Sequence, residues 1–307
     1  MEDKIPDILY HYCSVDTLVN ILQNRSLRIS EIAKSNDSME CKWLEKNILP
    51  KKIRECVEQN SRLKDSDQAI KNDIVLKCLD RYFNYYGDNI DIQAARLVLA
   101  MCFSQEGDLL SQWRGYAADG LGVSVGFTKE LFEKIVEVNR FIHIRKVLYS
   151  EKDQMNCFDK EIREYVEEVI LNKNVSSYAS LISLLAPIAE DAIAMKNPAF
   201  GEEKEWRLFT FFKKVENLND LNGDFERMGL NNLMSKLGYS VRSNKLVYYR
   251  DLLLDAVHGK DQLIDYVAEI ILGPKCKLSE RDDNLLLGSN GWDTSRIKIS
   301  KSTATYV

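Results

Sequence analysis

In Glu202-Glu203-Lys204-Glu205-Trp206-Arg207-Leu208-Phe209-Thr210, charged and apolar residues alternate along the chain. As a strand, this stretch places Glu203, Glu205 and Arg207 on one face and Lys204, Trp206 and Leu208 on the other. Two carboxylates about 7 Å apart on one strand face repel each other, and folding gains little from such a pair. The arrangement suits a site that stabilises positive charge or moves a proton. The alternative is a surface strand whose ion pairs each contribute less than ~1 kcal/mol, with Arg207 neutralising the two acids.

Strands and helices alternate irregularly around this stretch, which predicts an α+β fold with a mixed sheet that can be split. We expect one elaborated domain over residues 1–307, with helical insertions near 38–96 and 151–196, because no Pro/Gly/Ser-rich linker is present. The expected strands are 8–12, 27–30, 97–103, 121–127, 141–149, 203–207, 239–249, 266–272 and one near Ile297. The expected helices are 66–86, 91–96, 129–138, 159–172, 176–195 and 229–237.

The amino-acid composition limits which kinds of partner the protein can bind and in which cellular compartment we expect it. The net charge is −5 and charges of both signs are interspersed along the chain. Non-specific electrostatic binding to nucleic acid or to an anionic membrane is therefore not expected. The 7 cysteines are scattered without a C-x-x-C pair, and the 3 histidines are isolated, so neither a zinc site nor a disulfide framework is predicted. The acidic start and the lack of an apolar run of about 18 residues predict a cytoplasmic protein without a membrane span.

Two further segments carry candidate site residues. Ser104 ends an apolar strand, a usual position for a functional residue. Trp113 and Tyr116 follow in a short polar segment suited to stacking on a flat ring, although a helix that packs both into the core explains them equally well. His11 lies between two tyrosines in the first strand, where a half-buried structural histidine is the more common case. The spacing of Asn36, Asp37 and Glu40 is explained by helix capping.

Several of these motifs occur together in one known family. They are Leu9-Tyr10-His11-Tyr12-x-Ser14, Ser35-Asn36-Asp37-x-x-Glu40, Cys102-Phe103-Ser104, Gln112-Trp113-x-x-Tyr116, Gly122-Val-Ser-Val-Gly-Phe127, Glu203-Lys-Glu205-Trp-Arg207 and Ile270-Ile-Leu-Gly273-Pro274. In this order and combination, the chain resembles a large uncharacterised bacterial family labelled as domain of unknown function 2971. The resemblance extends over almost the whole chain and implies no activity by itself.

A more distant resemblance does imply an activity. A first strand bearing Tyr-His, then a helix of the form x-Leu-x-x-Ile-Leu, a short strand and a late Glu-x-Glu strand are similar to ADP-ribosyltransferase-type folds. By this resemblance His11 binds a ribose of NAD, Ser104 supports the nicotinamide side, Glu205 is the catalytic glutamate and Glu203 handles the acceptor. Trp113 or Tyr116 would stack on nicotinamide or on the acceptor. The middle motif is not a clean Ser-Thr-Ser, and helical insertions stretch the spacing.

The resulting first hypothesis is an NAD-consuming transferase or glycohydrolase without a metal, acting on protein, nucleic acid or water. Glu205 would stabilise the oxocarbenium-like transition state of glycosyl transfer. The resemblance further implies a bacterial toxin or an anti-phage defence effector. The second hypothesis is a non-catalytic module that binds a nucleotide or a partner on the same fold. The third is a nuclease-like effector that holds Mg²⁺ with Asp37, Glu40, Glu203 and Glu205.

Overall fold

The computed structural model describes residues 4–34, 42–86, 97–171, 191–212, 218–242, 244–258 and 266–306. The chain forms two compact units, the first from residues 1–34, 98–146 and 202–307 and the second from 35–97 and 147–201. Asn36, Asp37 and Glu40 lie outside the described residues, as do the helix expected at 91–96 and most of that expected at 176–195. The expectation of one domain with two helical insertions stays a prediction.

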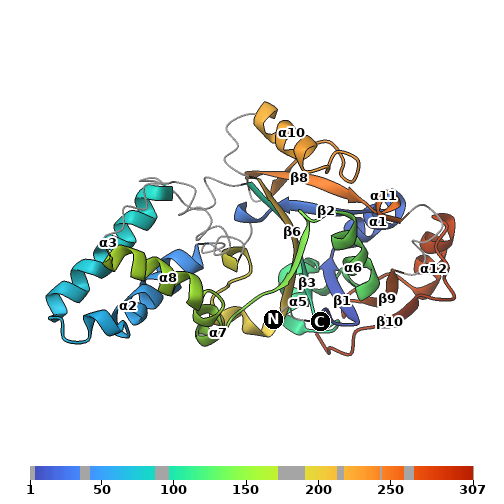
Figure 1. Cartoon of the computed structure of the whole chain (residues 1–307). Coiled ribbons are helices and arrows are strands. Elements are labelled where there is room, and N and C mark those ends of the chain that lie inside the picture. The colour runs from blue at the N-terminus through green and yellow to red at the C-terminus, as the bar shows by residue number, and fades with distance from the viewer. Residues whose placement is uncertain are drawn as a thin grey trace. The chain divides into compact units, whose positions relative to one another are not determined.

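The first unit is built on a sheet of ten strands (Figure 1). The strands are β1 (Ile8–Cys13), β2 (Ser26–Glu31), β3 (Leu97–Ser104), β4 (Val123–Thr128), β5 (His143–Lys146), β6 (Glu205–Phe212), β7 (Gly238–Arg242), β8 (Lys245–Leu253), β9 (Val267–Leu272) and β10 (Lys298–Lys301). Its helices are α1 (Val15–Asn24), α5 (Leu110–Tyr116), α6 (Lys129–Val138), α10 (Leu218–Arg227), α11 (Leu254–His258) and α12 (Glu280–Ser289).

The strands follow the order β10-β9-β4-β1-β3-β2-β8-β7, while β6 pairs with both β3 and β5. β1 pairs with β4 over its whole length, but with β3 the matched residues are Tyr10 and Ser104 alone. The β9–β10 pair is parallel and its neighbours are antiparallel, so the sheet is mixed. The expected α+β class with a mixed sheet is therefore confirmed, whereas the ADP-ribosyltransferase-type core stays a prediction.

The helix α6 shows how the sequence pattern produces this core. Its apolar residues Leu131, Phe132 and Ile135 are spaced for one helical face, and all three are buried. Phe132 meets Phe103 of β3 edge to face, with ring centroids 4.9 Å apart. α6 begins and ends at the residues that the sequence predicted.

The second unit is helical among its described residues. It contains α2 (Leu49–Glu58), α3 (Gln68–Tyr86), α7 (Glu151–Asn156) and α8 (Asp159–Ile170). α2, α3 and α8 pack on one another around a core that includes Ile53, Tyr82 and Tyr165. Within each helix, the apolar residues that belong to this core recur every three or four positions. This spacing gives each segment one apolar helical face, and the three faces share the core.

Two expected elements late in the chain are wrong. The helix expected at 229–237 is instead a series of turns with an isolated bridge at Met234, and the helix of this region lies earlier, at α10. The single strand expected at 239–249 is the hairpin of β7 and β8. Asn244 takes a left-handed φ of 60° there, which turns the chain inside a run of strand-forming residues.

Candidate active site at the junction of β3 and β6

Ser104 and Glu203 meet where β3 ends and β6 begins. The Ser104 hydroxyl donates to the Glu203 carbonyl at 2.8 Å and accepts from the Glu106 amide at 3.2 Å. The Gln105 amide donates to the Lys204 carbonyl at 3.1 Å, and the Lys204 ammonium pairs with Glu106 at 2.6 Å. Ser104 is buried. These bonds fix the segment that carries the two glutamates against the end of a central strand.

The two glutamates do not share a strand face, which corrects the expectation from alternation. Glu203 ends a short 3-10 helix, Pro198–Glu203, and β6 begins only at Glu205. Between them Lys204 has φ 45°, a left-handed conformation that is uncommon for a residue with a Cβ. This turn breaks the alternation, so the side chains of Glu203 and Glu205 are oriented independently. Strain of this kind often occurs at functional sites.

Glu205 and Arg207 form a buried bidentate ion pair. Arg207 Nε lies 2.7 Å from Glu205 Oε1, and its Nη2 lies 3.2 Å from Oε2. The Arg207 side chain is 0% exposed and that of Glu205 is 6% exposed. A fork of this geometry fixes the orientation of the carboxylate and supplies a counter-charge in a place that water does not reach.

Tyr116 links helix α5 to Glu203. Its hydroxyl donates to Glu203 Oε1 at 3.0 Å, and its ring is 43% exposed. Trp113, one turn earlier, is fully buried, meets Tyr12 edge to face and donates from its indole to Asp108 Oδ1 at 2.7 Å. Trp113 thus occupies the core position that the sequence left as the alternative to ligand stacking. Tyr116 is the member of the pair that reaches solvent.

The segment that follows β10 anchors the start of α5. Asp108 accepts hydrogen bonds from the Ser302 hydroxyl at 2.5 Å and from both the amide and the hydroxyl of Thr303 at 2.7 Å. Ala304 packs beside the buried Trp113. Burial opposes ionisation of Asp108, but the bonds from Ser302 and Thr303 outweigh it and hold its pKa below the usual value.

A second anchor holds the turn that follows α5. Ala118, Asp119 and Gly120 all have left-handed φ values, of 49°, 57° and 83°. Asp119 pairs with Lys275 at 2.7 Å and accepts from the Tyr306 hydroxyl at 2.7 Å, while the Lys275 ammonium lies 4.0 Å from the centre of the Tyr306 ring. Sequence reasoning missed both anchors. The Asp119-Gly120 pair is a turn signal, but nothing in the sequence indicates contact with residues 156 and 187 positions away.

His11 lies apart from this junction. Tyr10 is directly opposite Ser104, so alternation turns His11 to the other face of the sheet, where its ring centroid is 5.8 Å from that of Phe103. Its Nδ1 donates to the Cys102 carbonyl at 3.0 Å. Burial lowers the pKa of His11, which favours the neutral ring. The structure therefore brings Ser104 and Tyr116 to Glu203, with Glu205 two residues further along the chain and paired with Arg207, and leaves His11 on the face opposite Ser104. The cofactor-binding roles stay predictions.

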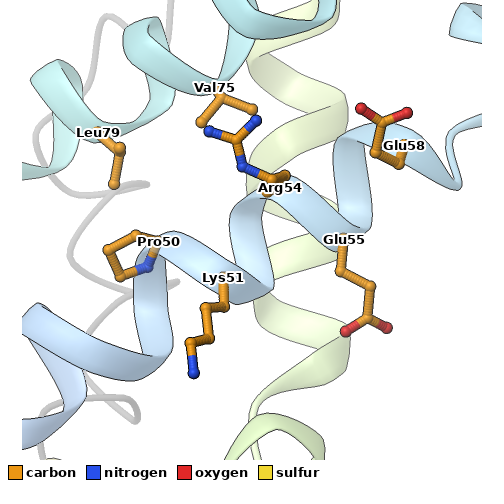
Figure 2. Close-up of a pocket in the computed structure, with 7 residues that line it drawn as sticks. All are labelled: Pro50, Lys51, Arg54, Glu55, Glu58, Val75 and Leu79. Carbon is orange, nitrogen blue, oxygen red and sulfur yellow. The ribbon is translucent and has the colours of Figure 1, made fainter.

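The second unit contains a pocket of about 380 Å³ (Figure 2). Its walls are Pro50, Lys51, Arg54, Glu55 and Glu58 of α2 with Val75 and Leu79 of α3. The charged walls already have partners: Lys51 pairs with Glu151 at 2.8 Å, and Glu58 pairs with Lys71 at 3.2 Å. The lining contains two basic and two acidic side chains together with the apolar Pro50, Val75 and Leu79. The pocket therefore has no preference for a ligand of one charge.

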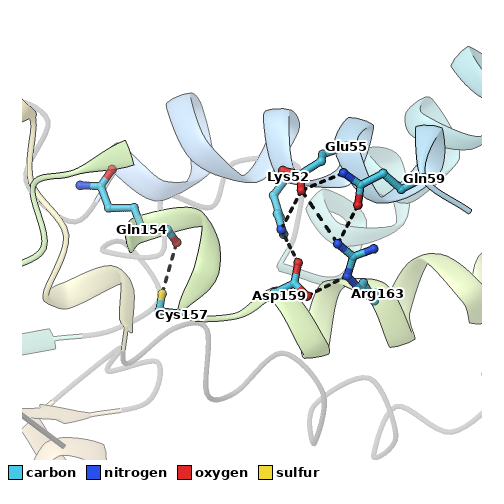
Figure 3. Close-up of polar contacts among 7 residues, drawn as sticks. All are labelled: Lys52, Glu55, Gln59, Gln154, Cys157, Asp159 and Arg163. Carbon is cyan, nitrogen blue, oxygen red and sulfur yellow. Dashed lines mark hydrogen bonds and ion pairs between the residues drawn. The ribbon is translucent and has the colours of Figure 1, made fainter. Parts of the chain in front are cut away.

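A polar network joins α2 to α8 in the same unit (Figure 3). The buried Lys52 ammonium pairs with Asp159 and, at 3.3 Å, with Glu55. Arg163 donates to Asp159 at 2.7 Å and to Gln59 at 2.8 Å. Burial opposes the charge on Lys52, but its bond to Asp159 and the acidic neighbours leave its pKa raised. The bonds from Arg163 and Lys52 lower the pKa of Asp159.

The described part of the chain lacks both a metal-binding cluster and a helix that could span a membrane. No group of three or more His, Cys, Asp or Glu side chains within those ranges is placed to hold a metal ion. Asp37 and Glu40 of the nuclease hypothesis are outside those ranges. No helix of the described part is long and apolar enough to cross a bilayer.

Residues 112–208 match the model of a family described as "Protein of unknown function (DUF2971)". The resemblance to that family, predicted from the motifs, is confirmed over this range. The matched range begins in α5 and ends in β6, so it contains Trp113, Tyr116, Glu203, Glu205 and Arg207. No curated protein and no solved structure matches the chain.

Proposed function

We propose that the junction of β3 and β6 is the active site of an NAD-consuming enzyme of the ADP-ribosyltransferase kind. The observation that carries the proposal is a pair of nearly buried carboxylates, Glu203 and Glu205, on either side of the left-handed Lys204. Ser104 bonds the backbone carbonyl of Glu203, and the half-exposed Tyr116 bonds its carboxylate. Breaking the bond between ribose and nicotinamide leaves positive charge on the ribose as nicotinamide departs with the electron pair. A preoriented carboxylate stabilises that charge more in the transition state than in the ground state.

The contacts suggest a division of roles. Arg207 fixes Glu205, which would face the developing charge without reorganising during the reaction. Glu203, which Tyr116 links to the surface, would accept the proton of the incoming nucleophile. That nucleophile is a protein, a nucleic acid or water, and a role as a toxin or in defence belongs to the same proposal. The buried Trp113 and His11, which lies on the face of the sheet opposite Ser104, are not needed for these two steps.

The test is release of nicotinamide from NAD by the full-length protein. Glu205→Gln should reduce it at least about 100-fold, the usual effect of removing one transition-state contact. Glu106→Gln is the matched control, because Glu106 lies at the same junction but is 46% exposed and pairs with Lys204. Unchanged turnover in a folded Glu205→Gln protein would refute the catalytic assignment.

Glu205→Gln removes the negative charge from the buried bidentate pair with Arg207 and can unfold the protein. A second variant, Glu205→Gln with Arg207→Met, removes both charges and avoids that penalty. If the double variant unfolds at the temperature of the parent protein and still releases nicotinamide at the parent rate, Glu205 is not catalytic.

One observation favours the non-catalytic binding module as the second candidate. The Glu205 carboxylate already has an arginine fork as partner, and the Ser104 hydroxyl already bonds two backbone groups, so both residues have structural roles. This candidate predicts saturable binding of NAD, or of another nucleotide, without nicotinamide release. Calorimetric titration with NAD beside the turnover assay separates the two functions.

A further inference from the structure

The hairpin of β7 and β8 exposes apolar side chains on one face. Two direct cross-strand pairs make up this face, Tyr239 with Tyr248 and Val241 with Leu246. Val241 is 72% exposed, Tyr239 53% and Leu246 48%. The tyrosine rings meet edge to face with centroids 5.4 Å apart, which holds the patch in shape. An exposed, ordered apolar cluster of this kind is typical of an interaction surface.

β7 is also the last strand in the order of the sheet. Its outer edge pairs with no strand of the described part of the chain. The backbone N–H and C=O groups along such an edge form a template for one more strand. A bound strand would place alternate side chains against Tyr239 and Val241.

The hairpin is basic, although the chain as a whole has a net charge of −5. The segment 236–250 contains Lys236, Arg242, Lys245 and Arg250 and no acidic residue. Lys236, Arg242 and Lys245 are exposed, and within the described ranges none of them forms an ion pair. Alternation turns Arg242 and its cross-strand partner Lys245 to the face opposite Val241 and Leu246. The hairpin therefore has an apolar face and a basic face, on the two sides of an edge that pairs with no strand of the described residues.

We propose that this hairpin, defined by β7 and the first half of β8, docks an extended acidic segment of a partner protein as an added strand. The charge selects this occupant over a second copy of the chain, because pairing two hairpins would bring like charges together. The strand edge and the aliphatic Val241–Leu246 pair favour a peptide over a nucleic acid, which would use rings and cations alone. The proposal is independent of the proposed catalytic site.

The test uses a labelled peptide of about ten residues, the usual upper length of a strand, with alternating Glu and Val. Binding to the full-length protein is followed by fluorescence anisotropy. We expect Val241→Asp and Arg242→Glu each to weaken binding about 10-fold. The matched controls are Leu285→Asp and Arg281→Glu on α12, both exposed and in the same unit, which should leave binding unchanged.

A second probe separates strand addition from simple charge attraction. The same peptide with N-methylated valines cannot donate backbone hydrogen bonds to an edge, so its binding should fall at least about 10-fold. Equal binding of the two peptides overturns the proposal. It is also overturned if the acidic peptide fails to bind at about 1 mM, or if oligothymidine or phosphatidylserine vesicles bind more tightly. Dimerisation of the protein that Val241→Asp abolishes would assign the surface to a second copy and likewise overturn it.

Discussion

Among the described residues, each unit contains an ion pair with a buried cation, and the two pairs differ in how far the partner acid is exposed. In the sheet, Arg207 and Glu205 have side chains 0% and 6% exposed, so neither charge reaches water. In the helical unit, the Lys52 side chain is 2% exposed but that of its partner Asp159 is 35% exposed, so water can solvate the carboxylate of that pair. Burial of an ion pair alone therefore does not indicate a site. What distinguishes the sheet pair is its place in the chain, two residues after Glu203, which Ser104 and Tyr116 both bond.

The largest effect is expected where neither charge has access to water. Glu205→Gln should lower the free energy of unfolding by about 3–5 kcal/mol, because the fully buried Arg207 guanidinium would lose the charge of its bidentate carboxylate partner. Urea denaturation measures the change. A loss below about 1 kcal/mol would mean that the Glu205–Arg207 pair contributes no more to stability than an ion pair on the surface does.

A buried acid without a partner extends the comparison to pH. Asp283 of α12 is buried, and neither carboxylate oxygen has a hydrogen-bond partner among the described residues. Burial, and then the charge of Asp282, raises the pKa of Asp283 to about 6. Between about pH 4 and that value the folded state keeps a proton that the unfolded state releases, so stability should fall by about 2 kcal/mol as pH rises through this window.

Urea denaturation at a series of pH values tests this sign. Asp283→Asn should remove the decline over that window while leaving stability near pH 4 almost unchanged. The proposed burial of an uncompensated carboxylate is contradicted if the variant and the parent protein show the same slope.

The anchor of α5 should have an intermediate effect. Asp108→Asn weakens the bonds from Ser302, Thr303 and Trp113 and should cost about 1–2 kcal/mol. Because the folded-state pKa of Asp108 is lowered, this contribution is present above the unfolded value and is lost as pH falls through the folded value. The gap between variant and parent should therefore close below about pH 4. A gap that persists at lower pH would exclude ionised Asp108 as the cause.

The smallest effect is expected in the helical unit. Lys52→Met keeps the buried stem and removes the charge, while Asp159 retains Arg163 and solvent as partners. The expected loss is about 1 kcal/mol by urea denaturation. If Lys52→Met destabilises as much as Glu205→Gln does, partial exposure of one partner does not explain the difference between the two pairs.

The part of the fold that could be predicted from sequence is the part that local periodicity specifies. α6 follows from the spacing of Leu131, Phe132 and Ile135, and β1 and β9 follow from apolar runs. The hairpin of β7 and β8 was missed because its turn at Asn244 lies inside a run of strand-forming residues. The sequence named the residues of the candidate site but not their arrangement, and their roles stay predictions. Strand alternation predicted that Glu203 belongs to the strand. In the structure β6 begins at Glu205, because Lys204 has a left-handed φ.

Contacts distant in sequence explain the remaining differences. Tyr116 was expected to stack on a ligand, and its bond to Glu203 joins residues 87 positions apart. His11 and Ser104 were grouped by resemblance, whereas the register of β1 with β3 turns them to opposite faces. Register and loop conformation depend on the whole sheet, so no local pattern reports them.

Nicotinamide release from NAD, measured side by side for Glu203→Gln and Lys52→Met, tests most directly whether the junction of β3 and β6 is the active site. Glu203 bonds Tyr116 at the junction, whereas Lys52 belongs to the polar network of the other unit. We expect a loss of at least about 100-fold in Glu203→Gln and parental turnover in Lys52→Met, with both proteins folded. Parental turnover in Glu203→Gln, an equal loss in both variants, or no turnover by the parent protein would contradict it.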